Sequence, residues 1–509
     1  MFRHFKLIGI IFLITILFFN PNNHYWGQDR DMVESEELTY IARDYSLVLP
    51  SGYTEIDTSY MDLVPSFTNG QSVIKIFVQP LSGSLSFTSY VSYGNLSAQK
   101  GRANFKIVNE DSGYTGECFY KLVEYYRPLI KNRANDMNFY QEIHLHDKSK
   151  NKVITIWSKS ADMDQWLMKR DVDFLLENIK LQTNQVKLAP TAKKELTNYH
   201  INYQGLTTEL DIAAGQTMWG RFFPGVPFYH GNYPYMLESE KNLAHKFQFI
   251  MSYATFPVDG PFPENEIRQI YQDGRIFMLT LQPFDPEEPD LSWVGLLEIL
   301  AGQHDEVLKE WAEGLKGIGE PVFVRPLNEM NGDWDPWCTW FYGKDNDLFI
   351  EAWQYIYEIF KAEGGENLYF VWNPHDRSYP DFTWNSPHLY YPGDEYVEWI
   401  GLTGYNNGTS FKGDVWRGFK EIYDPLYADY MKRYGDKPFM ITEFSCNEVG
   451  GSKAEWLHEC MDALNGNRYP NIRIVNWFDG QDGAWQYQIN SSSEAFRAFY
   501  AGLKLDNFL

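Results

Sequence analysis

Two glutamates in the C-terminal half of the sequence stand where paired carboxyl groups could carry out acid–base chemistry. Glu329 ends the apolar run 321–329, within "RPLNEMNGDW", and Glu443 lies in "ITEF", within the run 437–444. Two carboxyl groups at one site hydrolyse a glycosidic bond when one donates a proton to the leaving oxygen and the other attacks the anomeric carbon. A glutamate at a strand end is more often a paired or solvated surface residue, so the pair alone only suggests this chemistry.

Tryptophans gather directly after the first of these glutamates. Trp334, Trp337 and Trp340 follow Glu329 at three-residue spacing. Sugar rings stack their C–H patches on aromatic faces, while their hydroxyl groups need amides and carboxylates. We therefore expect Trp334 to contact a sugar, whereas Trp337 and Trp340 are equally well explained as the core of a short helix.

The elements that must position these side chains alternate, after about residue 205, between short apolar runs and longer amphipathic stretches. Eight runs predict β-strands: 217–223, 246–254, 275–282, 321–329, 367–374, 398–406, 437–444 and 473–480. Helices are predicted between them, and Ser452 with Glu455 has the spacing of a helix-capping pair. Alternating strands and helices favour a parallel sheet, and eight units predict an α/β fold with a closed (β/α)8 TIM barrel. An open doubly wound sheet is the alternative, but the chain contains no G-x-G-x-x-G or Walker sequence.

In a TIM barrel the C-terminal ends of the strands form the active site, so Glu329 and Glu443 are predicted to meet at the barrel mouth. The apolar surroundings of Glu329 are expected to raise its pKa, as a proton donor requires, while hydrogen bonds or a cation keep Glu443 charged. Arg325 lies four residues before Glu329 and is predicted to face the same side, deeper in the barrel. It either holds Glu443 ionised or forms a structural ion pair.

The preceding part of the chain, residues 31–181, predicts a smaller α+β domain with an antiparallel sheet. The alternating segment 139–160 predicts a hairpin about "DKSKNK", and 162–181 predicts a closing helix. Residues 182–204 are polar and are interpreted as a linker, which leaves 205–509 as the barrel domain.

A hydrophobic segment stands at the N-terminus of the sequence. Basic residues precede thirteen mostly apolar ones, from Leu7 to Phe19. This length suits a secretory signal better than a membrane span of ~20 residues. We expect residues 1–28 to be a signal peptide, with an uncleaved membrane anchor as the alternative, and the protein to be secreted, extracellular or periplasmic.

Composition limits the possible partners. The formal net charge is −24 and the sequence pI is near 4.9. A phosphate backbone is repelled by such a chain, so nucleic acid is not an expected partner. The four cysteines form no CxxC pair and no Cys/His cluster with ligand spacing, so neither a structural zinc site nor a disulfide framework is predicted. The chemistry expected of the two glutamates requires no metal or cofactor.

Three motifs that follow one another, "RPLNEMNGDW", "YYPGDEYVEWIGLTGYN" and "ITEF", resemble glycoside hydrolase family 26 over roughly residues 205–509. The resemblance implies a retaining barrel enzyme that cleaves β-mannans and, in some members, β-glucans or β-xylans. Its partner is then a polysaccharide substrate, it needs no cofactor, and we expect a monomer. By motif, Glu329 is implied to be the acid/base and Glu443 the nucleophile.

The resemblance also implies residues that bind substrate. Tyr405 in "GYN" matches the tyrosine that hydrogen-bonds the nucleophile, Trp334 matches a sugar-contacting aromatic, and Trp477 matches the floor of the sugar subsite. Trp372, on the predicted fifth strand, is expected to line the cleft. Asn328 replaces the histidine usual in the family, and relatives in the clan use this asparagine to bind the sugar 2-hydroxyl. The backbone sugar therefore stays open between mannan, which we favour, and glucan or xylan.

Two hypotheses from other classes stay open. A glycan-binding protein could use the same barrel without turnover, although the presence of both glutamates argues against it. Residues 31–181 could instead carry the main function, as a protein-interaction or cell-surface module.

Overall fold

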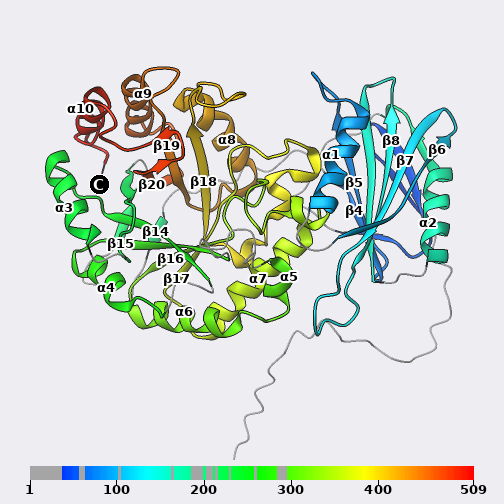
Figure 1. The fold of residues 1–509 in the computed structure, drawn as a ribbon, viewed down its shortest axis with the longest axis horizontal. Helices are drawn as coiled ribbons and strands as arrows, with labels where there is room; N and C mark the ends of the chain where they lie inside the picture. The colour runs from blue at the N-terminus through cyan, green and yellow to red at the C-terminus, as the bar shows by residue number, and fades with distance from the viewer. Residues whose placement is uncertain are drawn as a thin grey trace, which may run out of the picture.

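A computed structural model of the protein describes residues 37–56, 64–100, 105–161, 165–184, 199–201, 210–212, 216–228, 231–256, 261–283 and 295–508. These residues form an antiparallel sheet domain and a closed parallel barrel, which stand side by side in Figure 1. Both predicted architectures are confirmed. The predicted signal segment, 1–28, and most of the predicted linker, 182–204, lie outside the described residues.

Seven antiparallel strands form the main sheet of the N-terminal domain, in the order β3-β4-β5-β9-β8-β7-β6. Their bounds are β3 Thr54–Glu55, β4 Ser66–Thr68, β5 Ser72–Pro80, β6 Lys106–Thr115, β7 Cys118–Tyr126, β8 Phe139–Asp147 and β9 Lys152–Ser160. A smaller sheet joins β1 Leu38–Ile41, β2 Tyr45–Leu49 and β10 Ile179–Leu181. The hairpin predicted over 139–160 is confirmed, because β8 and β9 pair along their whole length.

The two faces of the main sheet have different partners, because side chains alternate along each strand. On β9, Ile156 belongs to the face that packs against helix α2 (Gln165–Asn178). Its neighbour Trp157 belongs to the opposite face, which joins helix α1 (Phe87–Lys100) and the core of the barrel in one hydrophobic cluster. The N-terminal sheet is therefore packed on both sides.

Eight parallel strands close the barrel in chain order. Their bounds are β13 Met218–Phe222, β14 Phe249–Thr255, β15 Ile276–Gln282, β16 Val322–Pro326, β17 Leu368–Trp372, β18 Trp399–Asn406, β19 Phe439–Cys446 and β20 Ile472–Phe478. All eight predicted strands are present. β16 ends earlier than predicted, so Glu329 lies in the loop after the strand.

The helices between the barrel strands bury one apolar face each against the strands. They are α3 Asn232–Leu243, α4 Glu264–Gln272, α5 Leu296–Leu300, α6 Asp305–Ile318, α7 Asn346–Ala362, α8 Phe419–Tyr434, α9 Lys453–Asn465 and α10 Ser493–Gly502. Shorter elements are β11 Tyr199–Ile201, β12 Leu210–Ile212, β21 Gln481–Asp482, β22 Trp485–Gln486 and the 3-10 turns η1 Thr339–Tyr342, η2 Thr383–Asn385, η3 Pro387–Tyr390 and η4 Asp394–Tyr396. The predicted cap of α9 is confirmed, since Ser452 Oγ accepts from Glu455 N at 3.2 Å.

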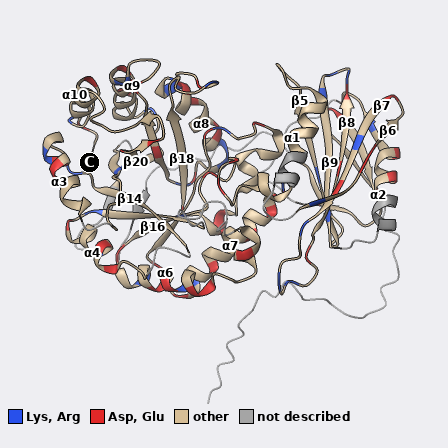
Figure 2. Cartoon of the chain, viewed as in Figure 1, with Lys and Arg blue, Asp and Glu red and all other residues tan. Residues whose placement is uncertain are grey.

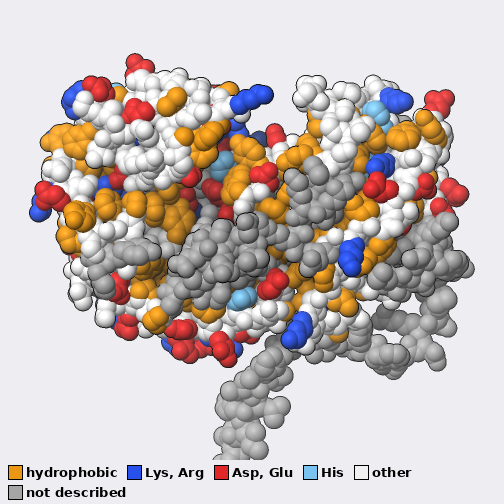
Figure 3. Space-filling view, in the orientation of Figure 1, with side chains coloured by type: hydrophobic (Ala, Val, Ile, Leu, Met, Phe, Trp, Pro, Cys, Tyr) orange, Lys and Arg blue, Asp and Glu red, His pale blue; other side chains and the backbone are white. Residues whose placement is uncertain are grey.

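The surface carries the charge that the composition requires. Asp and Glu residues recur along the outer helices, including α6 and α7 (Figure 2), which agrees with a net charge of −24. In the space-filling view a notch marks the upper border between the barrel and the N-terminal domain (Figure 3). Within the described ranges, none of the helices combines the length and apolar character that a membrane crossing requires.

Candidate active site

A sharp turn after β16 presents Glu329. Leu327 and Glu329 have φ angles of 48° and 55°, in the left-handed region that residues other than glycine seldom occupy. The turn is held from the next strand, because Glu329 N donates to Asn373 O at 2.8 Å. Backbone strain of this kind persists only where the surrounding structure enforces it, and it gathers at functional sites.

The carboxyl group of Glu329 is poised to give up a proton near neutral pH. Burial raises its pKa to about 7, and the nearby negative charge of Glu443 acts in the same direction. His375 and Arg325 oppose this rise without cancelling it. A carboxylic acid that keeps its proton close to pH 7 is suited to general acid catalysis.

A β-bulge brings Glu443 to the same end of the barrel. Met440 lies in the interior layer of the barrel, so strict alternation would place Thr442 inside and Glu443 outside. The pairing of β18 with β19 shifts register between Leu402 and Thr403. The bulge adds one residue to β19, so the alternation is shifted after it. Glu443 therefore faces the barrel interior, as Met440 does.

Two strong donors hold the Glu443 carboxylate. Tyr405 OH donates to Oε2 at 2.7 Å, and Arg325 Nη2 donates to Oε1. Glu443 is 5% exposed, so these bonds form with little competition from water. The carboxylate is thereby oriented, as a nucleophile must be.

Arg325 is the centre of a buried polar network. Its Nε and Nη2 donate to Thr280 Oγ1 at 2.9 and 2.7 Å, and its Nη1 donates to Asn373 Oδ1 at 2.8 Å. Burial works against the charge of Arg325, but the adjacent Glu443 carboxylate, together with Tyr253 and Glu329, raises the pKa of the guanidinium above its usual value. Asn373 also supplies the carbonyl that holds Glu329, so one network supports both carboxyl groups.

We expect Arg325→Lys to lower both catalysis and stability, because lysine keeps the charge but cannot make the forked contacts. A partly unpaired buried network should cost ~3 kcal/mol of unfolding free energy, and a misplaced Glu443 should lower kcat by ~100-fold. Urea unfolding and initial rates measure the two effects. The matched control is Arg275→Lys, which alters another buried arginine pair, with Glu240. A kcat loss no greater than that of the control would contradict this role.

An aromatic row lies beside the carboxyl groups, and the sequence interpretation missed two of its members, Tyr253 and Phe478. Tyr253 lies at the end of β14, with the Arg325 guanidinium 5.7 Å from its ring centre. Phe222 contacts Tyr253 edge-on at 5.1 Å and stacks on Phe478 at 4.6 Å, and Phe478 lies 6.0 Å from Tyr405. The signal that could have found Tyr253 was its position at the C-terminal end of a predicted barrel strand.

Trp334 forms an accessible aromatic platform on the loop after Glu329. It is 40% exposed, and its ring meets those of His375 at 5.3 Å and Tyr379 at 5.4 Å. Asn331 joins the two loops that carry these rings, since its Nδ2 donates to His375 O at 3.0 Å. The exposed ring is therefore held in place by its neighbours.

Asn328 lies between a buried tryptophan and β15. Its carbonyl accepts from Trp337 Nε1 at 2.6 Å, and its Oδ1 accepts from Gln282 Nε2 at 3.1 Å. The bond from Gln282 fixes the orientation of the Asn328 amide. Its NH2 group is then directed away from Gln282.

The prediction that Trp372 and Trp477 bind substrate is wrong, because both side chains are fully buried outside the strands. Trp372 stacks on Tyr430 of α8 at 6.1 Å. Trp477 packs against Trp456 of α9 at 6.3 Å and Phe499 of α10 at 5.0 Å. Neither ring is available to a sugar.

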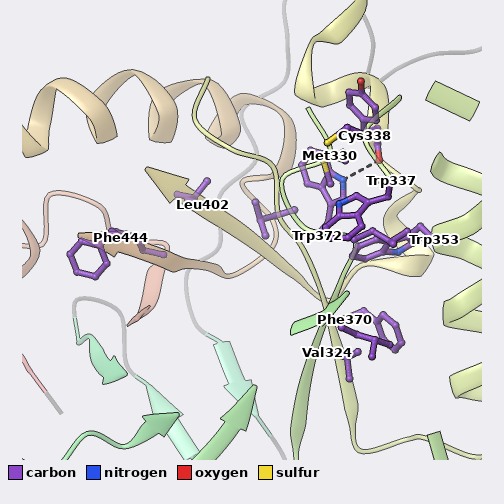
Figure 4. Close-up of a cluster of buried hydrophobic side chains, with 14 of the residues drawn as sticks. Val324, Met330, Trp337, Cys338, Trp353, Phe370, Trp372, Leu402 and Phe444 are labelled. Atoms are coloured by element: carbon purple, nitrogen blue, oxygen red, sulfur yellow. Dashed lines mark hydrogen bonds between the residues drawn. The ribbon is translucent and has the colours of Figure 1, made fainter. Parts of the chain in front are cut away.

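The physical reason is that each prediction chose a residue one position away from the residue that faces the barrel interior. A change of one position moves a side chain to the opposite face of a sheet. The inward positions are those of Asn373, one residue after Trp372, and Phe478, one residue after Trp477. Figure 4 shows Trp372 grouped with Phe370 and Trp353 instead.

Trp337 and Trp340, which the sequence left undecided between the core and the sugar site, both lie in the core. Trp337 is fully buried and Trp340 is 6% exposed, and both belong to the main hydrophobic cluster. Figure 4 shows Trp337 beside Cys338 and Met330. No cluster of three or more His, Cys, Asp or Glu side chains that could hold a metal ion occurs in the part of the chain that the structure describes.

Residues 296–445 match the sequence profile described as glycosyl hydrolase family 26. Endoglucanase H of Acetivibrio thermocellus is 29% identical over 258 residues, which cover 50% of this chain and 27% of that protein. A mannan endo-1,4-beta-mannosidase of Bacillus subtilis (strain 168) is 30% identical over 199 residues, which cover 37% of this chain and 47% of that protein. This chain thus spans about a quarter and about half of the length of these two relatives.

Solved mannanase structures align with part of this chain. A family 26 β-mannanase from Bacteroides ovatus aligns with 58% of this chain and 90% of its own, with 13% identity and a TM-score of 0.44. Bacillus subtilis mannanase man26 aligns with 54% of this chain over 82% of its own length, with 20% identity and a TM-score of 0.37.

A closed parallel barrel with one proton-holding and one anchored carboxyl group at its mouth defines the class of barrel glycoside hydrolases. The family match covers the Glu329 loop and reaches Glu443. The part of the barrel that carries both carboxyl groups is similar to glycosyl hydrolase family 26, and the chain is similar to mannanase and endoglucanase relatives.

Proposed function

We propose that the protein is a retaining endo-β-glycanase that cleaves a β-linked polysaccharide through a glycosyl-enzyme intermediate. The observation that carries this proposal is the contrast between the two carboxyl groups. Glu329 holds a proton near neutral pH, while Arg325 and Tyr405 hold Glu443 in place. Acid and nucleophile are thus assigned by their environments.

The proposed reaction has two steps at one site. Glu443 attacks the anomeric carbon while Glu329 donates its proton to the leaving oxygen, which breaks the glycosidic bond and leaves the sugar esterified to Glu443. A water molecule then attacks the anomeric carbon and displaces the Glu443 carboxylate, while Glu329, now a carboxylate, accepts the proton of that water. The anomeric configuration is retained because each step inverts it.

β-1,4-Mannan is the first candidate substrate, and β-glucan is the second. The mannanase names of several relatives support mannan. An endoglucanase name and the asparagine at position 328 support glucan. In either case we propose that the Asn328 NH2 group binds the 2-hydroxyl of the reacting sugar and that Trp334 stacks against a neighbouring ring.

Reducing ends released from separate galactomannan, glucomannan, mixed-linkage β-glucan and xylan test the proposal. We expect release from at least one of the first three, with a fall in viscosity that precedes extensive sugar release, because an endo enzyme cuts inside the chain. Release from mixed-linkage glucan alone would assign glucan to this site. If the folded protein releases no reducing ends from any of the four polymers, the proposed activity is contradicted.

A further inference from the structure

The barrel-facing side of the N-terminal sheet carries ionisable side chains in an unusual place. Lys75, Glu142, His144 and Lys159 each expose 5% of their surface or less. Lys75, Glu142 and His144 each alternate along their strands with apolar residues of the opposite face, and Lys159 lies two residues after Trp157 on β9. Charged groups are almost never this deeply buried unless they are paired, so their partners indicate what this face is built to hold.

Their partners are residues 343–347 of the barrel, which we name the docking segment. Trp157 Nε1 donates to Gly343 O at 3.0 Å. Glu142 accepts from Lys344 Nζ, and Lys159 Nζ donates to Asp345 Oδ1 at 2.9 Å.

Two further contacts strengthen this attachment. Tyr140 OH donates to Asp345 Oδ2 at 3.0 Å, and Lys75 Nζ donates to Asp347 Oδ1 at 2.6 Å. Lys344 and Asp345 are 4% and 0% exposed. Both charges of the barrel are therefore neutralised by the N-terminal sheet.

The docking segment is continuous with the loop that carries Glu329. Lys344 N donates to Thr339 O at 3.1 Å, at the start of η1. Just before η1, Cys338 Sγ donates to Glu329 O at 3.7 Å, and the Trp337 indole holds Asn328. A short path of packed residues thus connects the sheet to the backbone of Glu329.

A second contact reaches the same loop from helix α1. Tyr93 OH donates to Asp333 Oδ2 at 3.3 Å, directly beside Trp334. In Figure 1, α1 lies on the side of the N-terminal domain that faces the barrel. The loop from Glu329 to the docking segment is therefore held by the N-terminal domain at two points.

We infer that the N-terminal sheet is a positioning element of the catalytic acid, and that Glu142 and Lys159 act on Glu329 through the docking segment. The inference rests on the proposed function, because it takes Glu329 as the proton donor. The left-handed backbone at Leu327 and Glu329 needs enforcement from outside the loop. Leaving Lys344 or Asp345 buried without its partner removes that enforcement, since an uncompensated buried charge is strongly unfavourable.

The inference is tested with two full-length variants, Glu142→Gln and Lys159→Met. Each is compared with the wild type on two kinds of substrate. One is the polysaccharide that the wild type cleaves, whose leaving oxygen needs a proton. The other is a 2,4-dinitrophenyl β-glycoside of the matching disaccharide, whose leaving group needs none. We expect kcat/KM on the polysaccharide to fall by about 10- to 100-fold, as for a misplaced acid, and kcat/KM on the aryl glycoside, which reports the first step alone, to change less than twofold. The pH at which activity on the polysaccharide declines on the basic side should also shift in these variants.

The control is Glu110→Gln, which removes a half-exposed ion pair with Lys121 on the same sheet and should act as wild type. Tyr140→Phe removes the hydroxyl that donates to Asp345 and accepts from Arg127 Nε at 2.9 Å, without changing a charge, and serves where a charge variant does not fold. Folded variants with unchanged polysaccharide rates, or with equal losses on both substrates, would overturn the inference. If the wild type cleaves neither substrate, the proposed function itself fails.

Discussion

Glu443→Ala is expected to lower kcat/KM on the polysaccharide by ~10⁴-fold, equivalent to ~5.4 kcal/mol of transition-state stabilisation. The alanine variant has no carboxylate to form the glycosyl-enzyme intermediate. It also leaves Arg325 Nη2 and Tyr405 OH without their acceptor. Initial rates of reducing-end release measure the effect, and denaturant unfolding shows whether the variant is folded.

The nucleophile assignment has a product test as well as a rate test. Added azide should fill the space left in Glu443→Ala and attack an activated β-glycoside directly, which yields an α-glycosyl azide by a single inversion. Glu313→Gln, an exposed glutamate on α6, is the control and should behave as wild type. A β-configured azide product from Glu443→Ala would contradict the assignment.

Glu329→Gln is expected to lower kcat on the polysaccharide by ~10³-fold and to remove the basic limb of its pH profile. The acid must be protonated to work, and its pKa is raised to about 7. Wild-type activity should therefore decline above about pH 7, by ~tenfold per pH unit. The variant should still be glycosylated by a dinitrophenyl glycoside. A variant that keeps the same basic limb would show that another group sets it.

The same pKa has a consequence for stability. Because the folded-state pKa of Glu329 lies above the unfolded value of 4.5, the protonated form favours folding. Stability from this group is full below about pH 4.5 and is lost as the pH rises through about 7. Glu329→Gln carries no charge, so at pH 8 it should be more stable than wild type by up to ~3 kcal/mol. Urea unfolding at pH 5 and pH 8 should show the gain only at pH 8.

Much of the fold could be predicted because its signals are local. Each barrel strand is an apolar run bounded by polar residues, and the helices between them carry apolar residues on one face. The hairpin of β8 and β9 follows from alternation about a polar turn. Hydrophobic period and turn chemistry depend on neighbours in the chain, so one sequence suffices to find them.

The inward or outward direction of single side chains was less predictable. Trp372 and Trp477 were placed one residue away from the positions that face inward, and a one-residue error reverses the face. Glu443 faces inward only because of the bulge at Thr442, which depends on how β19 pairs with β18. Register between strands distant in sequence leaves little trace in a single chain.

The sequence by itself determined the barrel, the antiparallel sheet domain and the two carboxyl groups with their motifs, because these depend on periodicity and on short runs of residues. The tertiary structure decided which aromatic rings face the mouth, the raised pKa of Glu329, and the attachment of its loop to the N-terminal sheet. Burial, charge proximity and the pairing of Lys344 with Glu142 arise only when segments about 200 residues apart in the chain are brought together.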